Sequence, residues 1–275
     1  MRMAVFQGPL ASGEPSANLK HLDRAAADAA ARGAGLLLAP EMFLTGYHIG
    51  PEAVRRLAEP ADGPSATAAA EIARRHGLGL CYGYPEAGAD GRVYNAALLL
   101  DRQGRRLANH RKTHLYGEID RCAFAAADGE AATVAVLEGL KVGLLICYDV
   151  EFPENVRPLA LAGCDLALVP TAQMEPYEFV ARCMVPVRAY ENQIFMAYAN
   201  RCGAERELRY VGSSCVVGPD GADLARAGRG EELILADLDP DLLAASRRLN
   251  TYLADRRPEL YGGLAAPSRP FRTLA

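Results

Sequence analysis

The sequence predicts a single α/β domain, and three observations support that fold class. Short segments rich in Val, Leu and Ile, typical of buried strands, alternate with amphipathic segments of helical period. No internal repeat or low-complexity linker divides the chain. A length of 275 residues, 50% of them hydrophobic, is enough to bury a large core. Strands and amphipathic helices in this mixture imply two sheets that face each other, with helices outside.

The predicted strands are short apolar runs, several of them bounded by Gly, Pro or Asp turns. They cover residues 2–7, 35–40, 78–84, 92–101, 107–111, 130–137, 141–146, 165–169, 194–200, 211–217, 222–226 and 231–237. The predicted helices cover residues 16–32, 51–58, 64–76, 153–162, 177–192 and 240–248. Several of these helices open with a proline, which suits a first helical turn, and Ser16 is the expected N-cap of the first.

Composition and charge favour a cytoplasmic enzyme over other classes of protein. The net charge of −4 and the dispersed basic residues give no reason to expect nucleic acid or an anionic membrane as a partner. The apolar start of the chain is interrupted by Gly8 and Pro9, which argues against a signal peptide, and no apolar stretch approaches the length of a membrane span.

The seven cysteines and five histidines do not form a recognisable metal or disulfide pattern. The cysteine count is odd, the spacings are wide and there is no CxxC pair, so reduced thiols in the cytoplasm are expected. The histidines show no HxH grouping, and only one pair, His110 and His114, has HxxxH spacing. The sequence therefore predicts neither a metal site nor a cofactor.

Three chemically reactive residues each follow the end of a predicted strand. Glu41 follows the run GLLLAP, Lys112 follows the strand at 107–111, and Cys147 ends the run Leu140 to Ile146. Open α/β folds place their chemistry at the carboxyl ends of strands, so these side chains meet if their strands are neighbours. A thiol beside a base can act as a nucleophile. Each residue taken alone also fits a surface or core position.

The sequence motifs around these residues resemble those of the nitrilase superfamily of carbon–nitrogen hydrolases, and the resemblance covers about residues 2–260. They are PEMFLTGY, RKTHLYGE and CYDVEFPEN, in that order, together with YGYPE, YNAALLLD, VPTA and AYANRCG. Within that superfamily the chain is similar to the aliphatic amidases. TGYHIG, KTHLYGEIDR and NRCGAE in particular resemble 5-aminopentanamidase, an enzyme of lysine degradation, and the R-selective amidases.

The resemblance implies a fold, an assembly and a mechanism. The fold is a four-layer α-β-β-α sandwich with residues 1–248 as the hydrolase domain. The assembly is a homodimer or a higher homo-oligomer, in which the tail at 249–275 packs on a partner subunit; a frayed terminus is the alternative. The mechanism is hydrolysis of a small aliphatic carboxamide, expected to be omega-amino, through a thioester on Cys147. Glu41 is the expected base, and Lys112 with the backbone N–H of Tyr148 holds the oxyanion.

A second acid supports the lysine in this family, and two residues compete for that role. Glu118 and Asp120 both lie just past Lys112. The family register, counted back from Phe124, falls on Asp120, but Glu118 has the longer reach and is preferred. The residue left unused is expected to be a surface acid paired with Arg121.

The expected substrate-binding residues are Tyr148, Glu151, Tyr116 and Asn200. Glu151 stands four residues after the nucleophile, where a carboxylate would attract the amine of an amino-amide; an ordinary charge near a helix N-terminus is the alternative. His114 is expected to be a packed or hydrogen-bonding histidine.

Several other functions remain open at this point. The Glu-Lys-Cys set also fits a nitrilase or an N-carbamoyl amide hydrolase, although nitrilases commonly carry Trp after the nucleophile and this chain has Tyr148 and no Trp. A non-catalytic binding protein on the same fold and a thiol redox protein are the remaining alternatives. The redox reading lacks a resolving cysteine near Cys147 in sequence.

Overall fold

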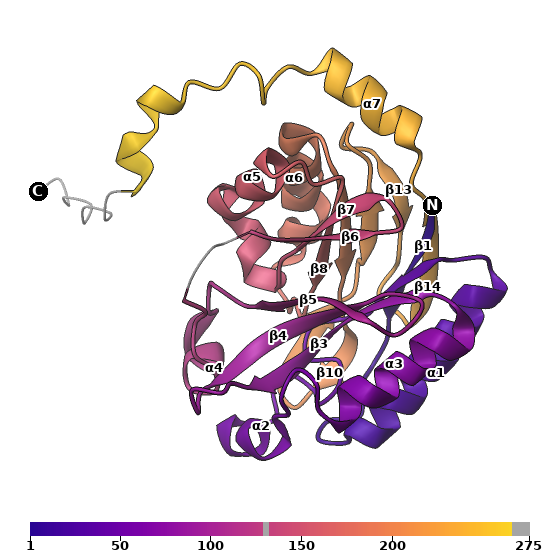
Figure 1. The fold of residues 1–275 in the computed structure, drawn as a ribbon. Coiled ribbons are helices and arrows are strands. Elements are labelled where there is room, and N and C mark those ends of the chain that lie inside the picture. Colours follow the sequence, from indigo (N-terminus) through magenta and orange to yellow (C-terminus); the bar gives the residue numbers. More distant parts are fainter. Residues whose placement is uncertain (129–131, 266–275) are drawn as a thin grey trace, which may run out of the picture.

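The computed structural model describes residues 1–128 and 132–265. Two six-stranded sheets form its centre (Figure 1). The first has the strand order β14 (Glu232–Asp237), β1 (Arg2–Gln7), β2 (Leu36–Leu38), β3 (Gly79–Ala87), β4 (Val93–Leu100) and β5 (Arg106–Arg111). The second has the order β13 (Asp223–Arg226), β12 (Cys215–Val217), β9 (Phe195–Ala199), β8 (Leu166–Pro170), β7 (Leu140–Leu144) and β6 (Thr133–Leu137).

Helices cover the outer face of each sheet. Helices α1 (Pro15–Ala31) and α3 (Pro64–His76) pack on the first sheet, and α5 (Pro153–Leu161) and α6 (Val185–Asn192) pack on the second. The remaining helices are α2 (Pro51–Leu57), α4 (Gly117–Arg121) and α7 (Pro240–Leu249). The predicted α-β-β-α sandwich is therefore confirmed.

Alternation along each strand sends side chains into two different apolar layers. In β2, Leu37 joins the core shared with α1 and α3, whereas Leu36 and Leu38 enter the core between the sheets. Facing them across that inner layer are residues of the second sheet such as Leu168 and Phe195. Central strands are thus apolar on both faces, as expected for strands buried on both sides.

Strand directions bring several carboxyl ends to one edge of the molecule. Strands β1, β2 and β3 are parallel, as are β7, β8 and β9. Strand β4 is antiparallel to β3, and β5 is antiparallel to β4, so β5 points the same way as β2. The chain after β2 and the chain after β5 therefore leave the first sheet at the same edge.

The structure corrects several element boundaries. The first helix begins at Pro15 with no side-chain cap, so Ser16 is not the N-cap. The strand predicted at 211–217 is two strands, because the chain turns at Gly212 and Ser213, both at positive φ. The first of them, β11 (Leu208–Val211), pairs instead with the unpredicted β10 (Cys202–Glu205). The start of the strand predicted at 130–137 lies outside the described residues.

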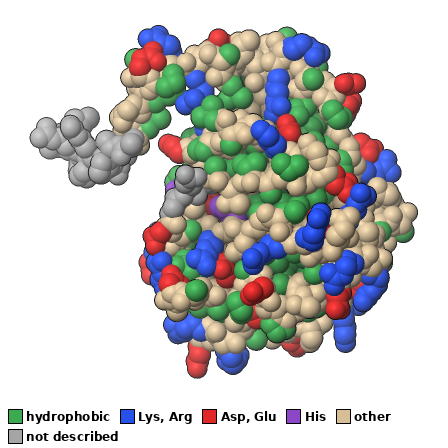
Figure 2. Space-filling model, viewed as in Figure 1, with side chains coloured by type: hydrophobic (Ala, Val, Ile, Leu, Met, Phe, Trp, Pro, Cys, Tyr) green, Lys and Arg blue, Asp and Glu red, His purple; other side chains and the backbone are tan. Residues whose placement is uncertain are grey.

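The tail leaves α7 and extends past α5 (Figure 1). Leu253 packs against the core beneath α5 and α6, and Tyr252 contacts Tyr190 of α6. Leu249, Leu260 and Leu264 are largely exposed. Phe271 lies outside the described residues. Figure 2 shows acidic and basic side chains interspersed over one face of the molecule.

No helix in the described parts of the chain has the length and apolar character needed to cross a membrane.

Candidate active site

Glu41 and Lys112 meet at the shared edge of the first sheet, as predicted. Lys112 directly follows β5, and its Nζ donates a hydrogen bond to Glu41 Oε1 over 2.8 Å. Both side chains are completely buried. Gly83 in β3 makes room for the chain at Glu41, because a Cβ on Gly83 would lie 2.4 Å from the backbone nitrogen of Met42.

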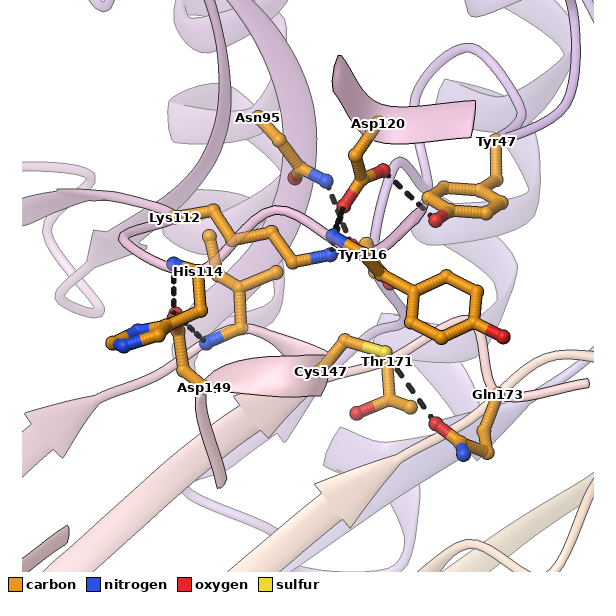
Figure 3. Close-up of polar contacts among 12 residues, drawn as sticks. Tyr47, Asn95, Lys112, His114, Tyr116, Asp120, Cys147, Asp149, Thr171 and Gln173 are labelled. Carbon is orange, nitrogen blue, oxygen red and sulfur yellow. Dashed lines mark hydrogen bonds and ion pairs between the residues drawn. The ribbon is translucent and has the colours of Figure 1, made fainter. Parts of the chain in front are cut away.

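Lys112 lies between two carboxylates. Its Nζ also donates to Asp120 Oδ2 over 2.7 Å (Figure 3). Burial alone would lower the pKa of Lys112, but the charges of Asp120 and Glu41 outweigh it and hold the pKa well above its usual value. Lys112 is therefore a buried cation.

Glu41 has one oxygen that is bonded and one that is not. Oε1 accepts from Lys112 and, over 2.7 Å, from the side-chain amide of Asn95. Oε2 is buried and has no hydrogen-bond partner among the described residues. Burial raises the pKa of Glu41 although the Lys112 charge lowers it. A buried carboxylate with a free oxygen and a raised pKa is suited to accept a proton near neutral pH.

Cys147 begins a short 3₁₀ helix (Cys147–Glu151) directly after the apolar run that contains β7. Its φ of +47° lies in the left-handed region, which is strained for a residue with a Cβ. Its side chain approaches the ammonium of Lys112, and its Sγ donates to Gln173 Oε1 over 3.6 Å (Figure 3). Burial and the Glu41 charge raise the pKa of the Cys147 thiol, and the Lys112 charge opposes them only in part. The thiol is therefore neutral at rest and needs a base.

Asp120, not Glu118, contacts the lysine. Asp120 is buried in α4 and also accepts hydrogen bonds from the phenol of Tyr47 and the backbone N–H of Tyr116, each over 2.8 Å. The Glu118 side chain is 90% exposed and lies 3.5 Å from Arg121. The preference for Glu118 is wrong because two residues separated by two positions point to different sides of a helix, and α4 turns Asp120 inward.

Tyr116, Tyr148 and Glu151 lie close to the nucleophile. The rings of Tyr116 and Tyr148 meet edge to face with centroids 5.4 Å apart. Burial raises the pKa of Tyr116 to about 12, and the neighbouring Tyr177 and the charge of Glu151 add to this effect. Burial also raises the pKa of Glu151, against the lowering effects of Gln173 and Lys112. These three side chains give the site an aromatic wall with one half-buried acid.

Asn200 does not line the pocket as predicted. It is fully buried, and its amide oxygen accepts from the backbone N–H of Gln173 and of Arg201 over 2.7 and 2.9 Å. Its amide nitrogen donates to the carbonyls of Gln173 and Gly212 over 3.2 and 2.8 Å. With its hydrogen-bonding capacity taken up by the backbone, Asn200 holds the backbone of Gln173 in place.

Four residues of the site escaped the sequence analysis: Tyr47, Asn95, Asp149 and Gln173. A polar Asn95 in the apolar strand β4 is a signal that could have revealed one of them. Gln173 follows β8 just as Cys147 follows β7, which is a second such signal. His114 stacks on Phe152 with ring centroids 4.2 Å apart, as expected of a packed histidine.

The described residues contain no group of three or more His, Cys, Asp or Glu side chains arranged to hold a metal ion. The seven cysteines are all free thiols.

Comparison with known proteins places the chain among enzymes that act on carbon–nitrogen bonds. The family described as carbon-nitrogen hydrolase matches residues 2–248. A protein of Pseudomonas protegens, described as a hydrolase in the pqqF 5′ region, is 52% identical over 96% of this chain and 92% of its own length. An (R)-stereoselective amidase of a Pseudomonas species is 38% identical over 82% of this chain and 81% of its own length.

Solved structures agree with these relatives. The amidase of Nesterenkonia sp. AN1 is 36% identical with a TM-score of 0.83, over 96% of this chain and 99% of that one. One form of that amidase shows acrylamide added at its active-site cysteine, and another is a complex with butyramide.

Proposed function

Because this chain belongs to the carbon–nitrogen hydrolase family, we propose that it hydrolyses small aliphatic carboxamides through a thioester on Cys147. The protein is an amidase that acts on carbon–nitrogen bonds other than peptide bonds. The observation that carries the proposed mechanism is the buried Lys112 bonded to Glu41 beside the thiol. That arrangement supplies a base, a fixed positive charge and a nucleophile in one buried cluster.

The first half of the reaction forms the thioester and releases ammonia. Glu41 takes the proton of Cys147, and the thiolate attacks the amide carbon. The oxyanion of the tetrahedral intermediate is held by Lys112 and by the backbone N–H of Tyr148; removing one such donor typically costs about 3 kcal/mol. Protonated Glu41 then gives its proton to the nitrogen, the carbon–nitrogen bond breaks and ammonia leaves.

The second half releases the acid. Glu41, ionised again, removes a proton from water, and the hydroxide attacks the thioester carbon. The carbon–sulfur bond breaks, the sulfur recovers its proton from Glu41, and the carboxylic acid departs. Asp120 keeps Lys112 charged and oriented throughout, since it bonds the ammonium directly.

Replacing Cys147 by Ala tests the proposed chemistry. The Cys147→Ala protein should be folded by circular dichroism and release no ammonia from any amide. Cys183→Ala is the matched control, since Cys183 is exposed, and it should keep full activity. Full activity in the Cys147→Ala protein would refute the mechanism.

An amine at the far end of the amide is the proposed substrate feature. Glu151 is a half-buried acid near Tyr116 and Cys147, and aromatic rings with a carboxylate are a favourable environment for a cation. This supports an amide such as 5-aminopentanamide as the substrate. A place in lysine degradation is supported only by the resemblance of TGYHIG, KTHLYGEIDR and NRCGAE to 5-aminopentanamidase. Two relatives that bear the name nitrilase are 34% and 31% identical to this chain. A panel of amides, nitriles and carbamoyl compounds is therefore the accompanying measurement.

We also propose a cytoplasmic homodimer in which the tail contacts the partner. Exposed apolar side chains on the tail and near α6, among them Leu249, Leu264 and Phe179, support it. Light scattering during size-exclusion chromatography should give about twice the chain mass of 29.4 kDa, and a monomer at micromolar concentration would refute the dimer.

A further inference from the structure

Asp149 is a completely buried carboxylate that the chemistry above does not use. It lies two residues after Cys147 in the 3₁₀ helix. Its Oδ2 accepts from the backbone N–H of Ile146 over 3.1 Å. Its Oδ1 accepts from the hydroxyl of Thr113 over 2.8 Å. The same oxygen accepts from the backbone N–H of His114 over 2.9 Å, as Figure 3 shows.

These donors flank two of the reactive residues. Ile146 directly precedes Cys147, and Thr113 directly follows Lys112. The two segments belong to different sheets: Lys112 follows β5 at the edge of the first sheet, and Cys147 follows β7 in the second. A single carboxylate therefore joins, across the sandwich, the backbone that carries the cation to the backbone that carries the sulfur.

We propose that Asp149 is a positioning residue that fixes the separation between the Lys112 ammonium and the Cys147 sulfur. The proposal rests on the roles proposed above for those two residues. It goes beyond them because Asp149 acts through its neighbours and touches neither substrate nor the reacting atoms.

The ionised state of Asp149 fits this role. Burial would raise the pKa of Asp149, but contacts with His110 and His114 and the charge of Lys112 hold it well below its usual range. Both oxygens are then acceptors, as the three hydrogen bonds require. An asparagine would turn an N–H₂ group toward either the Ile146 or the His114 N–H, which sets a donor against a donor.

The competing explanation is that Asp149 is only a local cap of the 3₁₀ helix. A cap contributes to the stability of its turn but has no specific effect on the chemistry of the neighbouring segment. A suitable control is Asp101, another buried acid, which accepts from the backbone N–H of Gln103 and Arg105 over 2.9 and 2.8 Å. It lies at the opposite end of β4 and β5 from Lys112.

The experiment compares Asp149→Asn with Asp101→Asn in three measurements. These are the melting temperature, kcat and KM for butyramide, and the rate at which iodoacetamide alkylates Cys147, followed by peptide mass spectrometry. For Asp149→Asn we expect kcat to fall about 100-fold with KM nearly unchanged, and Cys147 alkylation to slow about tenfold, because small displacements at a reacting centre have effects of this size. Asp101→Asn should lose melting temperature while kcat and alkylation stay near wild type.

Equal behaviour of the two variants would overturn the proposal, since Asp149 would then be a cap and nothing more. If Asp149→Asn does not fold, Thr113→Val removes one of the three hydrogen bonds with little change of shape. It should lower kcat several-fold with KM unchanged, and an unchanged kcat would refute the proposal. Alkylation is measured without substrate, so it tests the positioning of Cys147 even if the amide chemistry proposed here fails.

Discussion

A proton moved from Cys147 to Glu41 leaves the total charge of the buried site unchanged. Before the transfer the site holds two carboxylates and one ammonium, and afterwards it holds one carboxylate, one thiolate and the same ammonium. Burial raises the pKa of both the Glu41 acid and the Cys147 thiol. The desolvation cost therefore applies to the Glu41 carboxylate before the transfer and to the Cys147 thiolate after it. Lys112 stays bonded and charged on either side of the transfer.

Replacing the two neighbouring acids of α4 tests which one serves Lys112. Asp120→Asn removes a charge from a buried ion pair, so it should abolish most of kcat and cost about 3 kcal/mol of unfolding free energy. Glu118→Gln changes an exposed side chain and should shift stability by less than about 0.5 kcal/mol with kcat intact. Ammonia release and urea denaturation of both variants measure this, and loss of activity in Glu118→Gln alone would contradict the assignment.

The charge of Glu151 is testable with two substrates of matched length. In Glu151→Gln, KM for 5-aminopentanamide should rise about tenfold while KM for pentanamide hardly changes, because only the first has a cation to pair. Glu154→Gln is the control for a general acidic charge near the start of α5, since Glu154 is exposed in the first turn. An equal rise for both amides in Glu151→Gln would remove the ion pair from the account.

At the scale of elements, the site depends on a close approach between β3 and the chain that follows β2. A Cβ on Gly83 would lie 2.4 Å from Met42 N and 2.7 Å from Glu41 Cα. Both contacts are with backbone, which cannot rotate away, and Met42 already has a φ of +48°. The segment that carries Glu41 therefore has no room to accept even a methyl group.

Gly83→Ala should accordingly displace Glu41 and reduce kcat strongly, with a loss of about 1–3 kcal/mol in unfolding free energy from overpacking. Gly230→Ala is the control, because a Cβ there meets nothing within 4 Å. Steady-state kinetics and thermal melting of both variants measure the effect. Unchanged kcat in Gly83→Ala would show that the Glu41 segment can move without cost to the chemistry.

The sequence predicted the elements that carry Glu41, Lys112 and Cys147 because apolar strands and the residues at their ends have a strong signal. It did not separate Asp120 from Glu118, since a five-residue helix is too short to show a periodic pattern. Asn200 was assigned to the pocket because no sequence pattern indicates that its amide bonds the backbone of Gln173. Contacts between a side chain and a backbone group far away in the sequence depend on the packing of the two sheets. No local sequence pattern predicts that packing.

At the scale of the whole molecule, Glu205 joins the segment after β2 to the β10–β11 hairpin. The buried carboxylate accepts from the backbone N–H of Tyr47 and His48 over 3.2 and 2.8 Å and from Arg201 over 2.8 Å. Burial would raise its pKa, but Arg201 and the hydrogen bonds lower the pKa of Glu205 from 4.5 to about 2. Tyr47 in turn donates a hydrogen bond to Asp120, the acid that contacts Lys112, so this junction supports Lys112 from a distance.

The free energy of unfolding should therefore depend on pH over a defined acidic range. The lowered pKa of Glu205 stabilises the folded state at pH values above 4.5, by an amount on the order of 3 kcal/mol, and this is lost as the pH falls from 4.5 toward 2. Glu205→Gln should melt well below wild type at pH 7, and the difference should shrink near pH 2. Asp237→Asn removes an exposed ion pair with Arg2, so its melting temperature should stay close to that of wild type over the same pH range. A constant difference between Glu205→Gln and wild type from pH 7 to pH 2 would contradict the account.

The central claim is that one sulfur, brought to a lysine and a glutamate from the other sheet, carries the reaction. Its most direct test is to titrate the protein with iodoacetamide and compare, at each point, the alkylated fraction of Cys147 with the remaining ammonia release from butyramide. The account predicts that activity falls in proportion to Cys147 alkylation, reaches zero when it is complete, and is protected by excess amide. Ammonia release that persists with Cys147 fully alkylated would contradict it.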